Sequence, residues 1–245
     1  MGRPTWGAGQ HPCARLARML VLFDIDGTLL LSRGASMACF KAAGHELFAR
    51  EFATDGVSFG GGLDPMLWRA LCRRNGIEDA EAHHERFRAA YGRKLAERLG
   101  EGGVAYALPG VTALLDALAA HDGRLAVGLL TGNYPETGCL KLQAAGLDVG
   151  RFSVAAWGTD GVHRRELFPV ALARHAARTG QRLPAERVVV VGDTPHDVDV
   201  AAAHGARSLG VATGGAKLPE LQAAGATLAL PDLSETERVV DWILG

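Results

Sequence analysis

The chain has 245 residues, enough for one good-sized domain or for a domain with an insertion. Its composition, 48% hydrophobic and 22% charged, is that of an ordinary globular protein, and its formal net charge is −1. Bulk charge therefore gives no reason to expect a nucleic-acid partner or an acidic membrane surface. No stretch is long and apolar enough to span a bilayer, so we expect no membrane partner.

Residues 1–18 differ from the rest of the chain. They contain arginines, glycines and prolines but no acidic residue, and no apolar run suited to a signal peptide. We expect a disordered tail rather than a transit peptide, because serine and threonine are scarce and no amphipathic pattern is present. Met19 directly precedes the first apolar run, so translation starting there is an alternative to Met1.

The cysteines indicate a compartment. Cys13, Cys39, Cys72 and Cys139 stand apart without the paired spacing of a zinc site or a disulfide framework. We expect reduced thiols and a cytoplasmic protein.

The first apolar run leads into the sequence Asp-Ile-Asp-Gly-Thr at residues 24–28. In an extended strand residues i and i+2 point to the same side, so Asp24 and Asp26 are expected close together at the carboxyl end of a strand. Open α/β sheets bind their ligands at that end. Two carboxylates held so close stay ionised only if a cation lies between them or one keeps a proton. A calcium loop is excluded because residues 28–31 offer no further set of oxygen ligands.

Helical and strand patterns then divide the chain. Apolar residues recur at helical spacing over residues 35–52, 65–75 and 79–99, and no convincing strand precedes the glycine-rich break at 100–103. Beyond it, strands expected at 125–131, 154–157, 188–192, 208–212 and 227–230 alternate with helices expected at 111–121, 135–145, 165–179, 197–204, 218–224 and 235–244. This alternation predicts an α/β fold, a parallel sheet covered on both faces, with an all-helical inserted cap. The expected division is a tail at 1–18, a core at 19–33 and 107–245, and a cap at 34–106.

Polar residues also follow the next apolar strand. Thr131, Gly132 and Asn133 end the strand expected at 125–131, where a hydroxyl beside free backbone N–H groups suits phosphate oxygens. The alternative is a plain helix cap, since Thr and Asn favour that position.

The valine-rich strand at 188–192 gives a sharper signal. It ends in Gly192-Asp193, and Asp193 is placed to complete a Mg²⁺ site with the first pair, because Mg²⁺ prefers hard oxygen ligands. Asp197 either caps the following helix or supports the site.

A pair of basic residues, Arg164 and Arg165, opens the helix expected from residue 165. Cations at a helix N-terminus are slightly unfavourable with the dipole, which favours a purpose for one of them: to neutralise phosphate charge and hold the nucleophile. The alternative is a solvated helix start.

Taken together, the motifs at 24–28, 131–133 and 192–197 make the chain resemble the haloacid dehalogenase-like hydrolases, in the phosphoglycolate-phosphatase-like branch with a helical cap. The resemblance covers residues 19–245. It implies a Rossmann-like core and a Mg²⁺-dependent phosphatase that hydrolyses a small, phosphoglycolate-like phosphomonoester through an aspartyl-phosphate. Asp24 is then the nucleophile and Asp26 the general acid and base. Thr131 with Gly132 and Asn133 binds the phosphoryl group, and Mg²⁺ is held by Asp24, Asp193 and the Asp26 backbone carbonyl.

The chain departs from the family pattern in two places. The family usually carries a lysine where this chain has Arg164 and Arg165; the distance to Pro169 favours Arg164, and Arg165 is the alternative. In the cap loop at residues 59–65, Gly62 stands where relatives often have an arginine, so a side-chain contact to the substrate is expected to be missing.

Other functions remain as alternatives. Asp26 argues against a dehalogenase, and the cap's Lys41 and Lys94 lack the setting of a Schiff-base lysine. A phosphomutase of the β-phosphoglucomutase kind would keep the same core residues and differ in the cap. A catalytically silent binding module is opposed by the intact acidic motifs. We expect a small-molecule phosphate ester as partner, and a monomer or homodimer.

Overall fold

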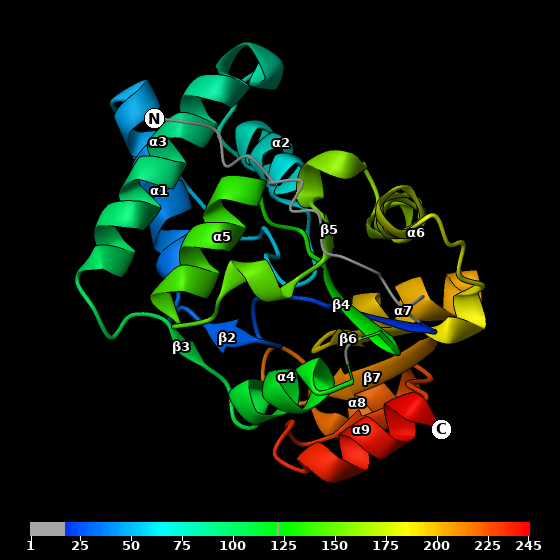
Figure 1. Ribbon diagram of the computed structural model, residues 1–245. Coiled ribbons are helices and arrows are strands. Elements are labelled where there is room, and N and C mark those ends of the chain that lie inside the picture. Colours follow the sequence, from blue (N-terminus) through cyan, green and yellow to red (C-terminus); the bar gives the residue numbers. More distant parts are fainter. Residues whose placement is uncertain (1–17, 122) are drawn as a thin grey trace.

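The computed structural model of the protein describes residues 18–121 and 123–245. Within these ranges six parallel strands form one sheet in the order β5-β4-β1-β6-β7-β8 (Figure 1). The strands are β1 (Met19–Phe23), β4 (Leu125–Leu130), β5 (Val154–Ala156), β6 (Val188–Gly192), β7 (Arg207–Val211) and β8 (Leu228–Leu230). The predicted Rossmann-like parallel sheet is confirmed, and its strands lie where the apolar runs placed them.

The central position of β1 follows from its composition. All five of its residues are buried apolar side chains, as are the valines of β6, which suits strands covered on both faces. Leu20 pairs with Ala126 of β4 on one side and with Val188 of β6 on the other. The carboxyl ends of β4, β1 and β6 therefore lie side by side.

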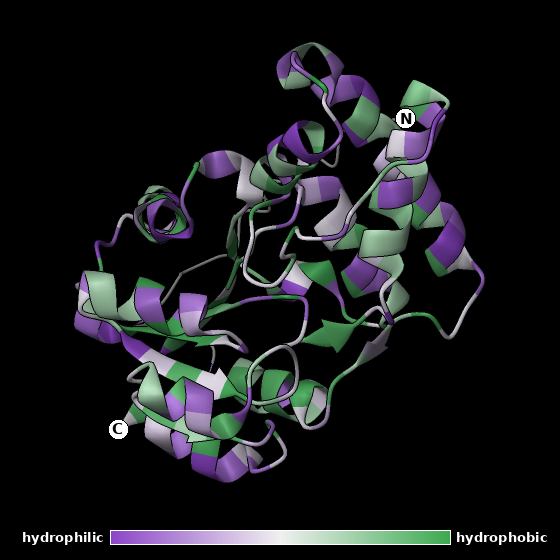
Figure 2. Cartoon of the chain, turned by 180° about the vertical axis from the view of Figure 1, so that it is seen from behind, coloured by the Kyte–Doolittle hydropathy of each residue, from purple (hydrophilic) through white to green (hydrophobic). Residues whose placement is uncertain are grey.

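Helices cover both faces of the sheet. They are α4 (Val111–Ala119), α5 (Pro135–Ala144), α6 (Leu167–Thr179), α7 (Pro195–His204), α8 (Leu218–Ala223) and α9 (Thr236–Leu244). Val21 and Phe23 pack in an apolar layer with α4 and α9, whereas Leu20 and Leu22 pack in a second layer with α6 and α7. Figure 2 shows hydrophilic and hydrophobic residues alternating along the helices, as amphipathic helices require.

A helical insertion, residues 32–105, leaves the sheet after β1. It contains α1 (Ala35–Phe48), α2 (Asp64–Arg74) and α3 (Ala80–Gly100). Its apolar core is rich in aromatic rings, with Trp68 stacked on Phe87 at 4.1 Å between ring centres. Helix α1 ends at Phe48 rather than at residue 52, because Ala49 adopts left-handed backbone.

The two chain segments that join the insertion to the core pair with each other. β2 (Leu30–Leu31) and β3 (Tyr106–Ala107) form an antiparallel ribbon that the sequence did not predict. Two residues are too few for a period-2 pattern to show, which explains the miss.

Several predictions concern the ends and surface of the chain. The predicted tail, apart from Arg18, lies outside the described residues, as does Cys13. Cys39, Cys72 and Cys139 are free thiols. Among the helices of the described ranges, none has the length and apolar character needed to cross a membrane.

Candidate active site

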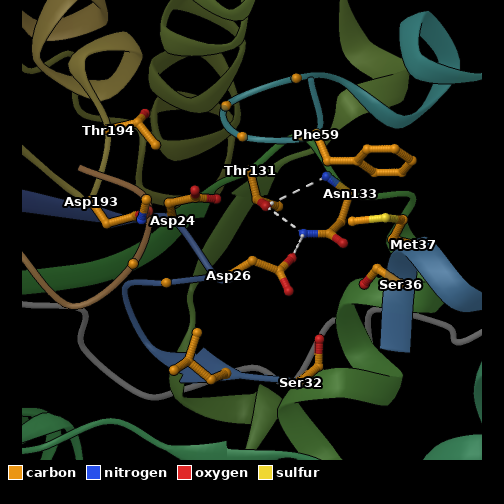
Figure 3. Close-up of a pocket in the computed structure, with 18 of the residues that line it drawn as sticks. Asp24, Asp26, Ser32, Ser36, Met37, Phe59, Thr131, Asn133, Asp193 and Thr194 are labelled. Atoms are coloured by element: carbon orange, nitrogen blue, oxygen red, sulfur yellow. Dashed lines mark hydrogen bonds between the residues drawn. The ribbon is translucent and has the colours of Figure 1, made fainter. Parts of the chain in front are cut away.

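The polar residues predicted at the strand ends meet in one cavity of about 410 Å³ (Figure 3). Asp24 and Asp26 follow β1, Thr131 and Asn133 follow β4, and Asp193 follows β6. The helical insertion supplies the opposite wall. The cavity thus lies where open α/β sheets place their ligands, beside the central strand.

Asp24 is buried in an ion-pair network with Arg164 and Asp197. Arg164 Nη2 lies 2.8 Å from Asp24 Oδ2 and 2.7 Å from Asp197 Oδ1. Burial raises the pKa of Asp24 to about 6, while the Arg164 guanidinium opposes that rise. Burial alone would lower the pKa of Arg164, but the carboxylates of Asp197 and Asp24 raise it. The guanidinium is therefore a permanent cation beside Asp24.

Arg164 and Arg165 point to different places. Arg164 is buried and lines the cavity, whereas Arg165 is exposed and pairs with Asp199, 2.7 Å from Nε to Oδ2. The structure brings Arg164 into the site and leaves Arg165 outside it. The residues stand in a short 3-10 helix, Arg164–Glu166, in which neighbouring side chains diverge.

Asp193 faces Asp24 across the position expected for a metal. Its carboxylate accepts hydrogen bonds from Gly215 N at 2.7 Å and Thr28 Oγ1 at 3.3 Å. Burial, followed by the charge of Asp24, raises the pKa of Asp193 to about 7. Asp24, Asp193 and Asp197 each offer an oxygen within 4.8 Å of the others.

Asp197 caps helix α7 and also contacts Arg164. Its Oδ2 accepts hydrogen bonds from Thr194 N and Oγ1 in the capping box that begins α7. Its Oδ1 accepts from Arg164. Asp197 is thus held between Arg164 and the start of α7, and Asp24 and Asp193 are the two other carboxylates of the cluster, a ligand type that suits a hard cation such as Mg²⁺. Two buried carboxylates facing one another also favour a cation between them.

A second network surrounds Asp26 and contains a residue that the sequence analysis missed. Lys141 Nζ lies 2.6 Å from Asp26 Oδ2 and 2.6 Å from Asn133 Oδ1. Asn133 Nδ2 donates to Asp26 Oδ2 and to Thr131 Oγ1, each at 2.9 Å. One local feature of the sequence points to Lys141: it lies four residues after Thr137, and both residues are on the buried side of α5.

Gly132 lets the insertion approach the end of β4. A Cβ on Gly132 would lie 1.9 Å from the carbonyl oxygen of Gly62. Asp64 N, at the start of α2, donates to Gly132 O at 2.7 Å. Asp64 also lines the cavity, and its Oδ2 accepts from Tyr134 N. Burial raises the pKa of Asp64 to about 7.

These features define a class of protein: an α/β protein whose acidic side chains gather in a pocket at the carboxyl edge of a parallel sheet. The model of the haloacid dehalogenase-like hydrolases matches residues 21–202, and the chain belongs to this family. The family resemblance and the prediction of an enzyme of this hydrolase class are confirmed.

The relatives of this chain include proteins named as a phosphatase and as a kinase. The phosphoglycolate phosphatase of Pectobacterium atrosepticum is 30% identical over 197 residues, which cover 78% of this chain and 79% of that protein. The tyrosine-protein kinase PtkA of Mycobacterium tuberculosis is 32% identical over 191 residues, 76% of this chain and 59% of that one. A hydrolase from Pseudomonas syringae shares the fold, with a TM-score of 0.69, 23% identity, and coverage of 93% of this chain and all (100%) of that one.

Proposed function

We propose that the protein is a Mg²⁺-dependent phosphatase that hydrolyses a small phosphomonoester through an aspartyl-phosphate on Asp24. The observation that carries the proposal is the buried Asp24 carboxylate, held by Arg164 at 2.8 Å and facing Asp193. The phosphatases among the relatives make phosphoglycolate the first natural substrate to test.

Binding of the phosphoryl group falls to Arg164 and the loop after β4. Thr131 Oγ1 accepts a hydrogen bond from Asn133 Nδ2, so its own hydrogen is available to a phosphoryl oxygen. Arg164 supplies a fixed positive charge. During phosphoryl transfer negative charge lies on the equatorial oxygens of the transferred group. Preorganised donors such as these stabilise that charge, and this stabilisation is usually the largest contribution to the rate.

In the first step an Asp24 carboxylate oxygen forms a bond to phosphorus, and the bond from phosphorus to the leaving oxygen breaks. Asp26 donates its proton to that oxygen. In the second step Asp26 takes a proton from water, the water oxygen bonds to phosphorus, and the bond to Asp24 breaks. Phosphate leaves and both carboxyl groups return to their starting states. Lys141 and Asn133 hold the Asp26 carboxylate in place for both transfers.

Mg²⁺ would be held by Asp24 and Asp193, with the backbone carbonyl of Asp26. When bound it would neutralise charge on the phosphoryl oxygens. We further propose that the helical insertion acts as the cap over the active site, at about the predicted residues 34–106. We also propose that the enzyme is cytoplasmic, in keeping with its free thiols.

The test is turnover of 4-nitrophenyl phosphate with Mg²⁺ and with EDTA, for the wild type and Asp24→Asn. We expect metal-dependent turnover that Asp24→Asn lowers by at least about 10³-fold, because the nucleophile is lost, while circular dichroism stays unchanged. Arg165→Gln is the control for a charge change outside the cavity. Absence of metal-dependent turnover would favour a phosphomutase or a binding module instead, and retained activity in Asp24→Asn would refute the nucleophile assignment.

A further inference from the structure

The cations that line the cavity are nearly all engaged. Among the described lining residues the basic side chains are Arg33, Lys141 and Arg164. Arg164 is held between Asp24 and Asp197, and Lys141 between Asp26 and Asn133. Arg33 is exposed, and its guanidinium carbon lies 5.2 Å from the ring centre of Tyr106, which does not line the cavity. Among the described residues of the insertion that line the cavity, Arg33 is therefore the one basic side chain, and its guanidinium contacts Tyr106 outside the lining rather than the catalytic groups.

Within the lining that the insertion supplies, apolar side chains form one patch, the apolar wall, next to Ser36. Met37 and Phe59 lie on the side of Asn133, away from Asp24 and Asp193 (Figure 3). Phe40 supports the Phe59 ring edge-on, 5.5 Å between centres. Leu67 continues the same wall. Met37 is 48% exposed, so its thioether is free to contact a ligand.

An acidic group adds to this preference. Asp64 lines the cavity from the start of α2 in the insertion, and it is hydrogen-bonded to the loop after β4 through Gly132 O and Tyr134 N. Together with Asp26 it makes the space beyond the phosphoryl site more favourable for a neutral group than for an additional carboxylate.

We propose that the leaving group of the substrate is uncharged and largely apolar, an alkyl or aryl alcohol, rather than a carboxylate-bearing one such as glycolate. This inference rests on the proposed phosphatase function. It predicts that Met37 and Phe59 contact the leaving group, while Arg33 makes no contribution to its recognition.

The test uses matched substrates with Mg²⁺: 4-methylphenyl against 4-carboxyphenyl phosphate, and ethyl phosphate against phosphoglycolate. Each pair has similar size and differs by one negative charge. We expect kcat/KM at least about tenfold higher for the uncharged member of each pair. In the aryl pair this expected order runs against the intrinsic reactivity of the two esters, because the carboxylated phenol is the better leaving group.

Variants of the apolar wall test whether its side chains cause the preference for an uncharged leaving group. Met37→Ala and Phe59→Ala should each lower kcat/KM for 4-methylphenyl phosphate by about tenfold, mainly through KM. Met37→Lys should reverse the preference within the aryl pair. Val162→Ala is the matched control, because Val162 is also 48% exposed but lies outside the cavity lining.

The outcomes separate the two proposals. Preference for the carboxylated substrates, lost in Arg33→Gln, would overturn the inference and leave the phosphatase standing. Equal turnover within both pairs would also overturn it. If 4-nitrophenyl phosphate is hydrolysed with Mg²⁺ but none of the four esters is, the inference fails and the phosphatase stands; if 4-nitrophenyl phosphate is not hydrolysed either, the proposed function fails and the inference with it.

Discussion

Lys141 is a buried cation whose position explains how the Asp26 carboxyl group is oriented. The lysine side chain is 2% exposed, whereas that of Asp26 is 41% exposed and reaches into the cavity. A buried ammonium group is costly unless it is paired, and Asp26 and Asn133 provide the partners. Lys141 also stands in the last turn of α5, where a positive charge is favourable with the helix dipole.

Replacing Lys141 tests this positioning role. Lys141→Met keeps an unbranched side chain, one atom shorter, but removes the charge, so Asp26 loses the contact that aims it at the leaving oxygen. We expect kcat/KM, which reports the first transfer alone, to fall by about tenfold to a hundredfold for ethyl phosphate and much less for 4-nitrophenyl phosphate, because a good leaving group needs little proton donation. Steady-state kinetics on both substrates measures the ratio.

The controls separate positioning from folding. Lys141→Arg should recover part of the loss, and Lys41→Met removes an exposed lysine that pairs with Glu51 instead. An equal loss on both substrates would show that Lys141 serves only to hold the structure.

At the scale of elements, the turn after β1 fixes the distance between the acidic motifs. Gly27 has φ +79°, and a Cβ there would lie 2.5 Å from Asp193 Oδ2. Thr213 Oγ1 donates to Gly27 O at 2.6 Å and ties the turn to the loop after β7. A glycine is thus required both by the left-handed backbone and by the approach of the Asp193 carboxylate.

A pair of alanine variants separates these two requirements. Gly27→Ala and Gly146→Ala each place a side chain on left-handed backbone, at a cost of about 1 kcal/mol in the free energy of unfolding. Gly146 has φ +76° but open space around it, so only Gly27→Ala displaces Asp193. We expect both to unfold at lowered urea concentrations, Gly27→Ala at the lower of the two because it also displaces the buried Asp193, and only Gly27→Ala to lose most Mg²⁺-dependent turnover. Equal activities in the two variants would contradict the role assigned to this contact.

Helices and strands with strong local patterns could be predicted from the sequence, whereas contacts between residues far apart in the chain could not. The buried runs of β1 and β6, each followed directly by an aspartate, place Asp24 and Asp193 at the same sheet edge, because parallel strands share their carboxyl ends. Lys141 meets Asp26 across 115 positions of sequence, and helix phase alone does not reveal that partner. The distance to Pro169 favours Arg164 over Arg165, and the structure brings Arg164 into the cavity while Arg165 pairs with Asp199 outside it.

Across the whole molecule, the insertion and the sheet share structure beside the site. Tyr134, which follows Asn133, packs in the aromatic core of the insertion. Its hydroxyl lies 2.8 Å from His84 Nε2, and the nearby Arg88 binds both carboxylate oxygens of Glu136 in α5. The loop that orients Asp26 is thereby fastened to the insertion whose Met37 and Phe59 form the apolar wall.

The stability of the whole fold should depend on pH through a buried histidine in α6. His175 is 1% exposed, and neither ring nitrogen has a hydrogen-bond partner among the described residues. Burial lowers the pKa of His175 below its usual 6.5. The unfolded chain therefore binds the proton more readily than the folded one, and stability falls as pH drops through 6.5 toward the folded value.

His175→Leu removes this pH dependence. The difference in free energy of unfolding between variant and wild type should grow in favour of the variant from pH 7.5 to pH 5, by about 1 kcal/mol for each unit by which the folded pKa is lowered. Subtracting the wild-type free energy of unfolding from that of the variant at each pH cancels the contributions of Asp24, Asp64 and Asp193. The raised pKa values of these three groups change stability with pH in the opposite sense. Urea unfolding at several pH values measures it, with His163→Leu as the exposed control. A difference that stays constant with pH would mean that the folded protein protonates His175 without penalty, contrary to its burial.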